Sequence, residues 1–381
     1  METDLTTKLI EQLHAADDQF VLAVTGGGSA AISRLLAVPG ASRTLLSASV
    51  PYSVEALQDY LRDWDEPAAC TEQTARRMAV EAFDLASGLV DPDQRVHGVG
   101  CTASLASDRA KRGPHRVHVA VQAADRTACY SLQLDKGARS RPDEELVAAA
   151  LVLDAMAEAA GIPHALTTPL LRPGEEVCRV VQQAPPEWPR LGTDVAWRHG
   201  MGRDGEAATP APPIVFPGAF NPLHDGHLAM AAAAEELLGQ PVVFELSMEN
   251  VDKPPLDFVE VARRVERFGE RPYLITLAPT FVEKATLLPG CTFVVGIDTL
   301  IRIADEDYYD ESEALRDEAI DHIADAGCRF LVFGRAFDGE FIALDDLGLP
   351  QALTDLCTGV PENKFRVDLS STELREAEAD E

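Results

Sequence analysis

The amino-acid sequence predicts an α/β protein with two domains, and three observations carry that prediction. First, 381 residues are more than one compact core of ordinary size accommodates. Second, apolar runs of strand length alternate with segments of helical spacing, which is typical of a sheet covered by helices. Third, the stretch 184–213 turns to Pro, Gly, Trp and charge. We therefore expect one domain over 1–162, a connector or small subdomain over 163–213, and a second domain over 214–381.

Composition and charge restrict the classes of partner. The chain has 63 acidic and 33 basic residues, a formal net charge of −30. This charge repels nucleic-acid backbones, so we expect no nucleic-acid partner, whereas a single nucleotide needs only local donors and a metal ion. No apolar run is long enough to cross a bilayer, and the N-terminus lacks the basic start and apolar stretch of a signal peptide. We expect a cytoplasmic protein that is not associated with a membrane.

Strand-like and helical patterns alternate in the N-terminal half. The buried-strand run Phe20–Val24 ends in the glycine cluster Thr25–Ser29, and a helix is expected from Ala30. We expect the glycine cluster to be a turn that accommodates an anion, with a plain tight turn as the alternative. Thr71 is a plausible N-cap for a helix that reaches residue 89. The other expected elements are helices at 5–16 and 142–160 and strands at 45–50, 96–100, 117–123 and 129–134, the last two paired as a hairpin.

The C-terminal half begins with the short strand Ile214–Phe216. Its further expected elements are strands at 242–247, 272–277, 292–295 and 329–333 and helices at 228–238, 257–268, 279–286 and 312–326. This regular alternation predicts a Rossmann-like parallel sheet.

Candidate chemistry is concentrated between Gly218 and His227, in the segment Gly-Ala-Phe-Asn-Pro-Leu-His-Asp-Gly-His. The segment follows a strand and opens a helix, where open α/β sheets bind ligands and where helix N–H groups favour phosphate. Gly218 allows the backbone to approach a ligand closely. His224 and His227 are three residues apart, so both imidazoles face one side of the first helical turn and can donate hydrogen bonds to phosphate.

This arrangement suits attack by a substrate phosphate on the α-phosphorus of a nucleoside triphosphate. Positioned donors, together with the Mg²⁺ that accompanies ATP, stabilise the charge of the transition state, and pyrophosphate leaves without a covalent enzyme intermediate. The rival interpretation of His-x-x-His is a metal site, but that site needs a third ligand, and the Asn-Pro and Gly context favours phosphate. We predict no protein-bound metal.

Gly-x-Phe-Asn-Pro-x-His-x-Gly-His also resembles the signature of the nucleotidylyltransferase superfamily. The resemblance implies catalytic roles for His224 and His227. It further implies that the loop binds the nucleotide through Gly218, Ala219, Phe220, Asn221 and Gly226.

A second signature lies near the C-terminus, where Ser370-Ser-Thr-Glu-Leu-Arg375 resembles the superfamily's Ser-Ser-Thr-x-x-Arg. The resemblance implies nucleotide contacts from Ser370, Ser371 and Thr372 and a catalytic contact of Arg375 with the β- and γ-phosphates. Taken alone, Ser370 and Glu373 also fit an ordinary helix capping box.

Two intermediate segments narrow the resemblance to nicotinate and nicotinamide mononucleotide adenylyltransferases. Phe293-Val-Val-Gly-Ile-Asp298 resembles their strand followed by Gly-x-Asp, and the strand from Arg329 to Arg335 resembles their strand that ends in Arg. The resemblance implies nucleotide contacts from Asp298 and Arg335. One departure is that the family's Trp after the Gly-x-Asp helix is missing, with Tyr308 and Tyr309 as the nearest aromatic residues.

The loop Asn250-Val-Asp-Lys253-Pro-Pro stands where acceptor-binding loops lie in the family. We therefore assign Asn250 and Lys253 to acceptor binding, although the loop matches no single acceptor. The alternative for Lys253 is a solvated lysine in a Pro-rich turn.

Residues 5–160 resemble the CinA C-terminal domain family, which includes nicotinamide mononucleotide deamidases. The resemblance rests on Thr25-Gly-Gly, Pro39-Gly-Ala-Ser, Pro51-Tyr-Ser and Thr71-Glu-x-x-Ala-x-x-Met-Ala. The family's nucleophilic Ser precedes Thr-Gly-Gly, where this chain has Leu22-Ala-Val, and the Lys of the family's Tyr-Ser-x-x-x-Lys is Leu57 here.

Because a nucleophile and its activating base are both missing, we expect the CinA-like domain to be catalytically degenerate. Its remaining roles are left open between nucleotide binding and homo-oligomerisation, and Ser29 is the alternative nucleophile.

Three hypotheses for the whole chain follow. The first is an adenylyltransferase acting on nicotinamide or nicotinate mononucleotide. The second is a nucleotidylyltransferase with another phosphorylated acceptor, of cytidylyl- or phosphopantetheine-type. The third is a nucleotide-binding regulatory protein without catalysis.

Overall fold

The structure is a computed structural model that describes residues 2–62, 70–91, 93–108, 112–184, 197–199, 206–207, 211–249, 255–337 and 340–366. The chain divides into two compact units. Unit 1 comprises Met1–Ala184 and Asp252–Glu260, and unit 2 comprises Pro185–Val251 and Val261–Glu381. The predicted class, α/β with a Rossmann-like parallel sheet in the C-terminal domain, is confirmed.

Unit 1 is a six-stranded sheet in the order β2-β1-β3-β4-β5-β6. Its strands are β1 (Asp18–Thr25), β2 (Leu45–Ser49), β3 (Arg95–Ser104), β4 (His115–Gln122), β5 (Arg126–Leu134) and β6 (Val177–Gln183). The strands β2, β1 and β3 are parallel to one another, whereas β4, β5 and β6 are added antiparallel. The predicted hairpin is therefore present as β4–β5, and β6 lies within the range left as a connector or small subdomain.

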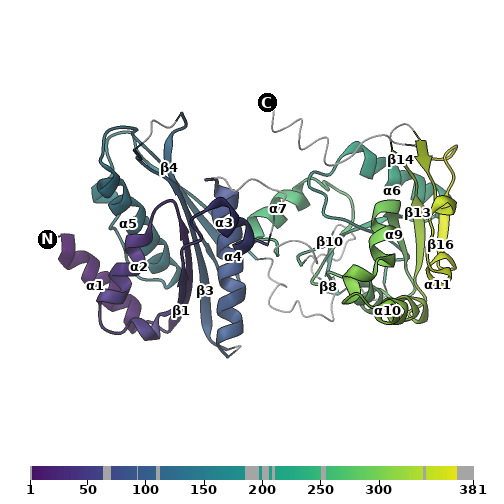
Figure 1. Cartoon of the computed structure of the whole chain (residues 1–381), viewed down its shortest axis with the longest axis horizontal. Coiled ribbons are helices and arrows are strands. Elements are labelled where there is room, and N and C mark those ends of the chain that lie inside the picture. The colour runs from purple at the N-terminus through teal and green to yellow at the C-terminus, as the bar shows by residue number, and fades with distance from the viewer. Residues whose placement is uncertain are drawn as a thin grey trace. The chain divides into compact units, whose positions relative to one another are not determined.

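Helices cover both faces of this sheet (Figure 1). They are α1 (Glu2–Ala15), α2 (Ser29–Ala37), α3 (Val54–Tyr60), α4 (Glu72–Leu89) and α5 (Arg141–Ala159). The largest core lies under α1, α2 and α5, and smaller apolar clusters lie under α3 and α4 on the other face. Thr71 caps α4 as predicted, since its side chain accepts a hydrogen bond from the Thr74 backbone N–H.

Unit 2 is an eight-stranded sheet in the order β16-β13-β12-β9-β10-β11-β7-β8. Its parallel strands are β9 (Ile214–Pro217), β10 (Val243–Ser247), β11 (Tyr273–Thr276), β12 (Thr292–Gly296), β13 (Arg329–Phe333) and β16 (Cys357–Val360). Two antiparallel strands extend one edge, β7 (Trp197–His199) and β8 (Glu206–Ala207). Beside the sheet, β14 (Arg335–Phe337) and β15 (Glu340–Ile342) form a hairpin.

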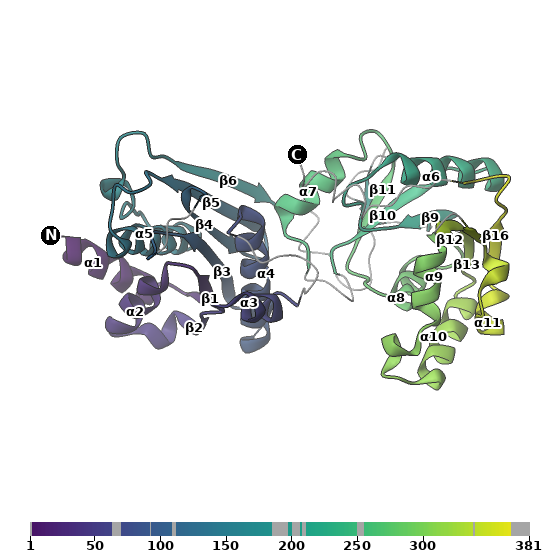
Figure 2. The same cartoon turned by 45° about the horizontal axis from the view of Figure 1, so that its top comes forward.

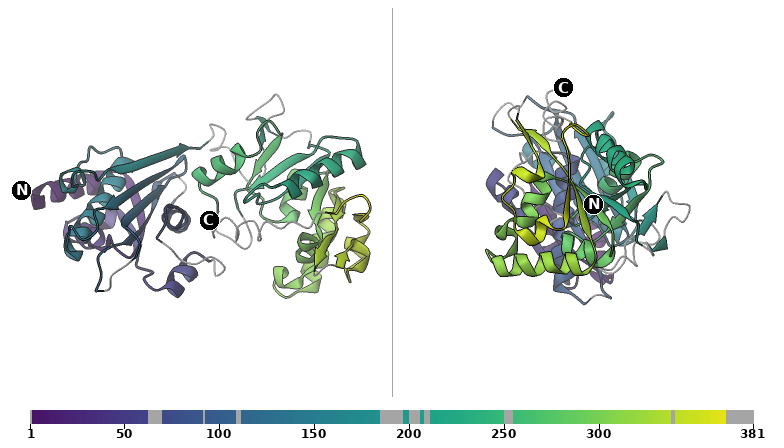
Figure 3. Two further views of the ribbon diagram at one scale, coloured as in Figure 1. Left: turned by 90° about the horizontal axis from the view of Figure 1, so that it is seen from above. Right: turned by 90° about the vertical axis from the view of Figure 1, so that its right-hand side faces the viewer.

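Helices of unit 2 also lie on both faces of its sheet (Figures 2 and 3). They are α6 (Asp225–Leu238), α7 (Phe258–Glu266, of which residues 258–260 belong to unit 1), α8 (Phe281–Leu287), α9 (Ile297–Ala304), α10 (Glu313–Asp325) and α11 (Gln351–Thr354). Successive side chains of a strand point to opposite faces of the sheet. In β12, Phe293 and Val295 pack with α8, α9 and α10 on one face, and Val294 packs with α6 on the other. Short 3₁₀ turns complete both units at Ala41–Arg43, Thr168–Leu170, Glu306–Tyr309 and Leu344–Asp346.

Candidate active site

The candidate site lies where the order of the parallel strands reverses. Numbered along the chain, the parallel strands from β11 through β16 lie in the order 3-2-1-4-5-6, with β9 as the first strand and β12 as the fourth. Open α/β sheets bind ligands beyond the carboxyl ends of the strands at this switch point. The loop that leaves β9 at Gly218 and enters α6 at His224 therefore occupies the position expected of a nucleotide-binding loop.

His224 and His227 form a stacked pair at the start of α6. His224 is the N-cap residue and His227 stands three residues later, which confirms the prediction that both lie on the first turn. Their ring centroids are 3.8 Å apart with 29° between the ring planes. Their Nδ1 atoms accept backbone hydrogen bonds, His224 from the Gly226 N–H at 3.1 Å and His227 from the His224 N–H at 3.4 Å.

These hydrogen bonds fix the tautomer of both imidazoles. A neutral ring whose Nδ1 accepts a hydrogen bond carries its proton on Nε2, so each ring is an Nε2–H donor. The same bonds satisfy two N–H groups at the start of α6, those of His224 and Gly226. A phosphate at this helix would therefore be held chiefly by imidazole N–H groups.

Apolar rings keep His227 neutral. The rings of Phe220 and Phe216 lie edge-on to His227, with centroids 5.2 and 6.0 Å away. Burial, and then the neighbouring His224, lower the pKa of His227 from 6.5 to about 4. Burial also lowers the pKa of His224, against the opposing charge of Asp225. Both imidazoles thus donate hydrogen bonds at neutral pH without carrying fixed charge.

The loop backbone is held from several sides. The Gly218 N–H donates to the Glu245 carbonyl oxygen at 3.1 Å, and Arg264 Nη1 donates to the Ala219 carbonyl oxygen at 2.8 Å. Phe220 has a positive φ of 45° and its ring is 1% exposed. A β-carbon on Gly218 would lie 2.7 Å from that ring, so the glycine is required by the close approach of Phe220. Asn221, which follows, is half-buried.

Asp298 and Arg335 are brought together at the ends of two neighbouring strands. Asp298 lies in the first turn of α9 directly after β12, and Arg335 begins β14 just after β13. Arg335 Nη1 lies 2.5 Å from Asp298 Oδ2, and both side chains remain more than a third exposed. The strands β9, β12 and β13 are adjacent and parallel. This ion pair and the His224/His227 pair therefore both lie beyond the carboxyl ends of these strands.

Six predicted site residues lie outside the described residues. These are the acceptor-binding Asn250 and Lys253 and the second-signature residues Ser370, Ser371, Thr372 and Arg375. Their roles stay predictions.

Comparisons with known proteins bear on the C-terminal part of the chain. The cytidylyltransferase-like family matches residues 215–377. A putative nicotinamide mononucleotide adenylyltransferase of Schizosaccharomyces pombe is 31% identical over an alignment of 114 residues, and the match covers 26% of this chain and 45% of that protein.

Residues 215–377 form a cytidylyltransferase-like domain.

Among solved structures, the competence/damage-inducible protein CihA from Agrobacterium tumefaciens is similar to 42% of this chain and 94% of its own, with 18% identity and a TM-score of 0.34. A competence-damaged protein (CinA) superfamily protein from Escherichia coli is similar to 42% of this chain and 90% of its own, with 18% identity and a TM-score of 0.32.

Sequence reasoning overlooked two polar groups that support the cytidylyltransferase-like domain. Arg264 donates a hydrogen bond to the Ala219 carbonyl oxygen, but in the sequence it is one of several charged residues of an amphipathic helix, so no motif pointed to this contact. Glu245 is an acidic residue within the apolar strand β10, and this pattern in the sequence could have indicated a buried carboxylate with a partner. Its buried carboxylate accepts hydrogen bonds from Thr276 and from Lys284, whose Nζ lies 2.8 and 2.9 Å from the two carboxylate oxygens.

In unit 1, the glycine turn predicted to accommodate an anion is filled by a carboxylate of the same chain. Glu145 accepts hydrogen bonds from the Gly28 N–H at 3.0 Å, the Ala30 N–H at 3.0 Å and the Ser29 hydroxyl at 3.1 Å. Leu22–Val24, which stand where the resemblance to the CinA C-terminal domain family places a nucleophile, are fully buried in β1.

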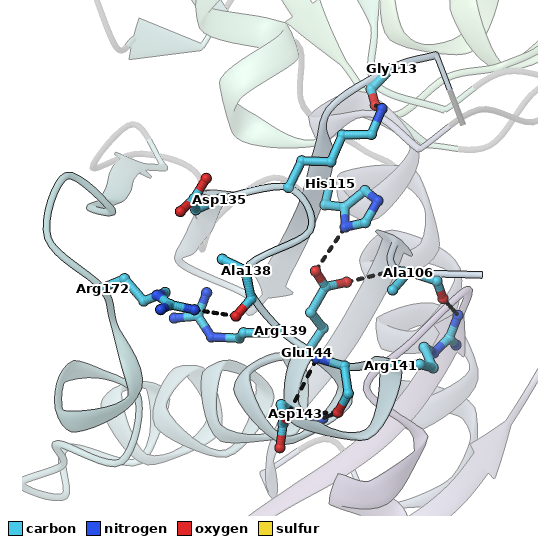
Figure 4. Close-up of polar contacts among 12 residues, drawn as sticks. Ala106, Gly113, His115, Asp135, Ala138, Arg139, Arg141, Asp143, Glu144 and Arg172 are labelled. Atoms are coloured by element: carbon cyan, nitrogen blue, oxygen red, sulfur yellow. Dashed lines mark hydrogen bonds and ion pairs between the residues drawn. The ribbon is translucent and has the colours of Figure 1, made fainter. Parts of the chain in front are cut away.

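The neighbouring Glu144 is used structurally (Figure 4). Its carboxylate is fully buried and accepts a hydrogen bond from the Ala106 N–H at 2.6 Å, while its other oxygen lies 2.7 Å from His115 Nδ1. Arg141 donates to the carbonyl oxygens of Ala106 and Gly26. The first turn of α5 therefore ties together the loops at this end of the sheet.

Two features are absent from the ranges of residues that the structure describes. Within those ranges, no helix combines the length and apolarity needed to cross a membrane. Over the same ranges, no group of three or more His, Cys, Asp and Glu side chains is placed to hold a metal ion.

Proposed function

We propose that the cytidylyltransferase-like domain is an active nucleotidylyltransferase that transfers AMP from ATP to nicotinamide or nicotinate mononucleotide. In the proposed step, a phosphate oxygen of the acceptor forms a bond to the α-phosphorus of Mg-ATP. The bond from the α-phosphorus to the bridging oxygen breaks, and pyrophosphate leaves with the electron pair.

The observation that carries the proposal is the neutral, stacked imidazole pair at the switch point. The transition state places extra negative charge on the α-phosphate oxygens, and preorganised donors stabilise that charge more than they stabilise the ground state. His224 and His227 are held by backbone hydrogen bonds with Nε2 as the protonated nitrogen, so they need no reorganisation during the reaction. The choice of acceptor is supported by the similarity to the putative nicotinamide mononucleotide adenylyltransferase of Schizosaccharomyces pombe.

The test measures pyrophosphate release by the purified full chain. Mg-ATP and Mg-CTP are each combined with nicotinamide mononucleotide, nicotinate mononucleotide, phosphopantetheine and a polyol phosphate, and products are identified by mass. We expect release with ATP and a pyridine mononucleotide. Release only with CTP, or only with another acceptor, contradicts the assignment of substrates. Tight nucleotide binding without release in any combination contradicts the proposal of catalysis.

A variant assigns the activity to the site. We expect His227→Ala to lower turnover by about 10²- to 10³-fold, the usual cost of removing one transition-state donor. The matched control is His322→Ala, which removes an exposed histidine of the same unit whose Nε2 lies 2.8 Å from the Thr286 hydroxyl. The melting temperature of both variants should stay close to that of the natural protein. Equal turnover in the two variants would show that the reaction occurs elsewhere.

A further inference from the structure

A hollow of about 390 Å³ lies on unit 1, away from the glycine turn. Its walls come from the ends of β3, β4 and β5, from β6 and from the last turn of α5. The charged residues that line it are Arg95, Arg126, Arg179 and Glu158. Its volume falls within the range of small-molecule sites.

The lining of the hollow gathers guanidinium groups on a strongly acidic chain. Three guanidinium groups and one carboxylate line it, whereas the whole chain carries a formal charge of −30. Two further carboxylates lie beside the lining, Asp18 at 3.0 Å from Arg95 and Asp125 at 3.8 Å from Arg126. Acidic surroundings repel anions everywhere except where cations are gathered, so such a cluster is the place where an anion would collect.

Each arginine is anchored by part of its donor set. Arg126 Nη2 donates to the Ala159 carbonyl oxygen at 2.9 Å, and Arg179 Nε donates to Glu158 Oε1 at 2.8 Å. Arg95 Nη2 lies 3.0 Å from the buried Asp18. A guanidinium has five N–H donors in a planar fork, so these anchors orient each group and leave donors for a ligand.

Neighbouring carboxylates restrict where an anion can bind. A second hollow of about 400 Å³ shares Arg95 and Arg126 with the first, but it is also lined by Asp91, Asp93 and Asp125. Those carboxylates would repel an anion from the second hollow. The first hollow, in contrast, offers the guanidinium groups beside the apolar side chains of Val121, Ala128 and Val181 and the ring of Tyr130.

We propose that the first hollow binds the phosphate group of a small phosphorylated metabolite. The three guanidinium groups would hold the phosphate, and the apolar wall would take the organic part of the ligand. Arginine suits this role because its fork matches the geometry of phosphate oxygens. The proposal gives unit 1 a ligand site that is independent of its glycine turn and of the cytidylyltransferase-like domain.

The test is a titration of the full chain with inorganic phosphate at low ionic strength, followed by calorimetry. Arg95→Gln and Arg126→Gln each remove one proposed phosphate contact. The matched control is Arg34→Gln, which makes the same charge change on the half-buried Arg34 of α2. We expect phosphate affinity to fall about tenfold in each of the first two variants, the effect of losing one charged hydrogen bond, and to be unchanged in the control.

Further arms separate the alternatives. His227→Ala should retain the phosphate site that Arg95→Gln weakens, because the two sites are distinct. Arg95→Lys keeps the positive charge and should bind phosphate better than Arg95→Gln. This result would show that the lower affinity of Arg95→Gln comes from the lost charge and not from unfolding. Equal affinity in all variants, or no saturable binding to the natural protein, overturns the proposal. Binding of malonate in place of phosphate would also overturn it, in favour of a carboxylate ligand.

Discussion

His227 should stay neutral well below the pH at which an ordinary histidine becomes charged. Its pKa is lowered from 6.5 to about 4, first by burial among Phe216 and Phe220 and second by the adjacent His224. With such a pKa, only about 1% of His227 is protonated at pH 6, compared with most of an unperturbed histidine. Titration of His227 should therefore not limit turnover between pH 6 and pH 8.

The lowered pKa of His227 also makes the free energy of unfolding depend on pH. The unfolded chain protonates this histidine near pH 6.5, while the folded chain resists protonation until about pH 4. As pH falls through this window, the unfolded state gains protons that the folded state does not, so the folded state loses stability. Each pKa unit corresponds to about 1.4 kcal/mol, so the loss by pH 4 is up to about 3 kcal/mol.

The assay is a histidine-selective NMR titration of the full chain from pH 8 to pH 4. The His227 resonances are assigned from the spectrum of His227→Gln. We expect an apparent pKa near 4 and the Nε2-protonated tautomer at neutral pH. A midpoint near 6.5, or an Nδ1-protonated ring, would refute the reasoning from burial and from the backbone hydrogen bonds to Nδ1.

Two further predictions concern the support of the site. Lys284→Met leaves the Glu245 carboxylate buried without its cation and should cost about 3 to 5 kcal/mol, whereas the double variant with Glu245→Gln should recover most of that loss. Hydrogen exchange in peptides of β10 and α8 measures the effect, and equal losses in the single and double variants would disprove it. Gly218→Ala forces its β-carbon against the Phe220 ring and should destabilise unit 2 by about 1 to 3 kcal/mol and lower turnover. Gly348→Ala is the control, because no atom lies within 4 Å of its added carbon, and denaturant midpoints with pyrophosphate assays compare the two.

Local patterns predicted most of the elements that carry the fold. The strand at 329–333 has the predicted bounds, and the helix expected at 312–326 is α10, Glu313–Asp325. The short strand β16 and the β14–β15 hairpin were not predicted. Of these, β16 is only four residues long, and its pairing with β13 is a long-range contact that leaves no periodic signal in the sequence.

The candidate site was predictable where chemistry depends on neighbouring residues along the chain. The spacing of His224 and His227 defines a helical first turn, and their stacking follows from that geometry. The contact of Arg264 with the Ala219 carbonyl was not predictable, because 45 residues separate the partners and either residue type is common in other settings. The filling of the glycine turn by Glu145 joins residues more than a hundred positions apart.

Residue types and short spacings were enough to predict the alternation of strands and helices and the paired histidines at a strand-to-helix turn. These features are encoded locally, in residue type and in spacings of a few positions. The strand order, which places the His224/His227 pair and the Asp298–Arg335 ion pair beyond the carboxyl ends of neighbouring strands, became known only from the folded structure. The same holds for the clustering of Arg95, Arg126 and Arg179, because folding brings these residues together from distant parts of the chain.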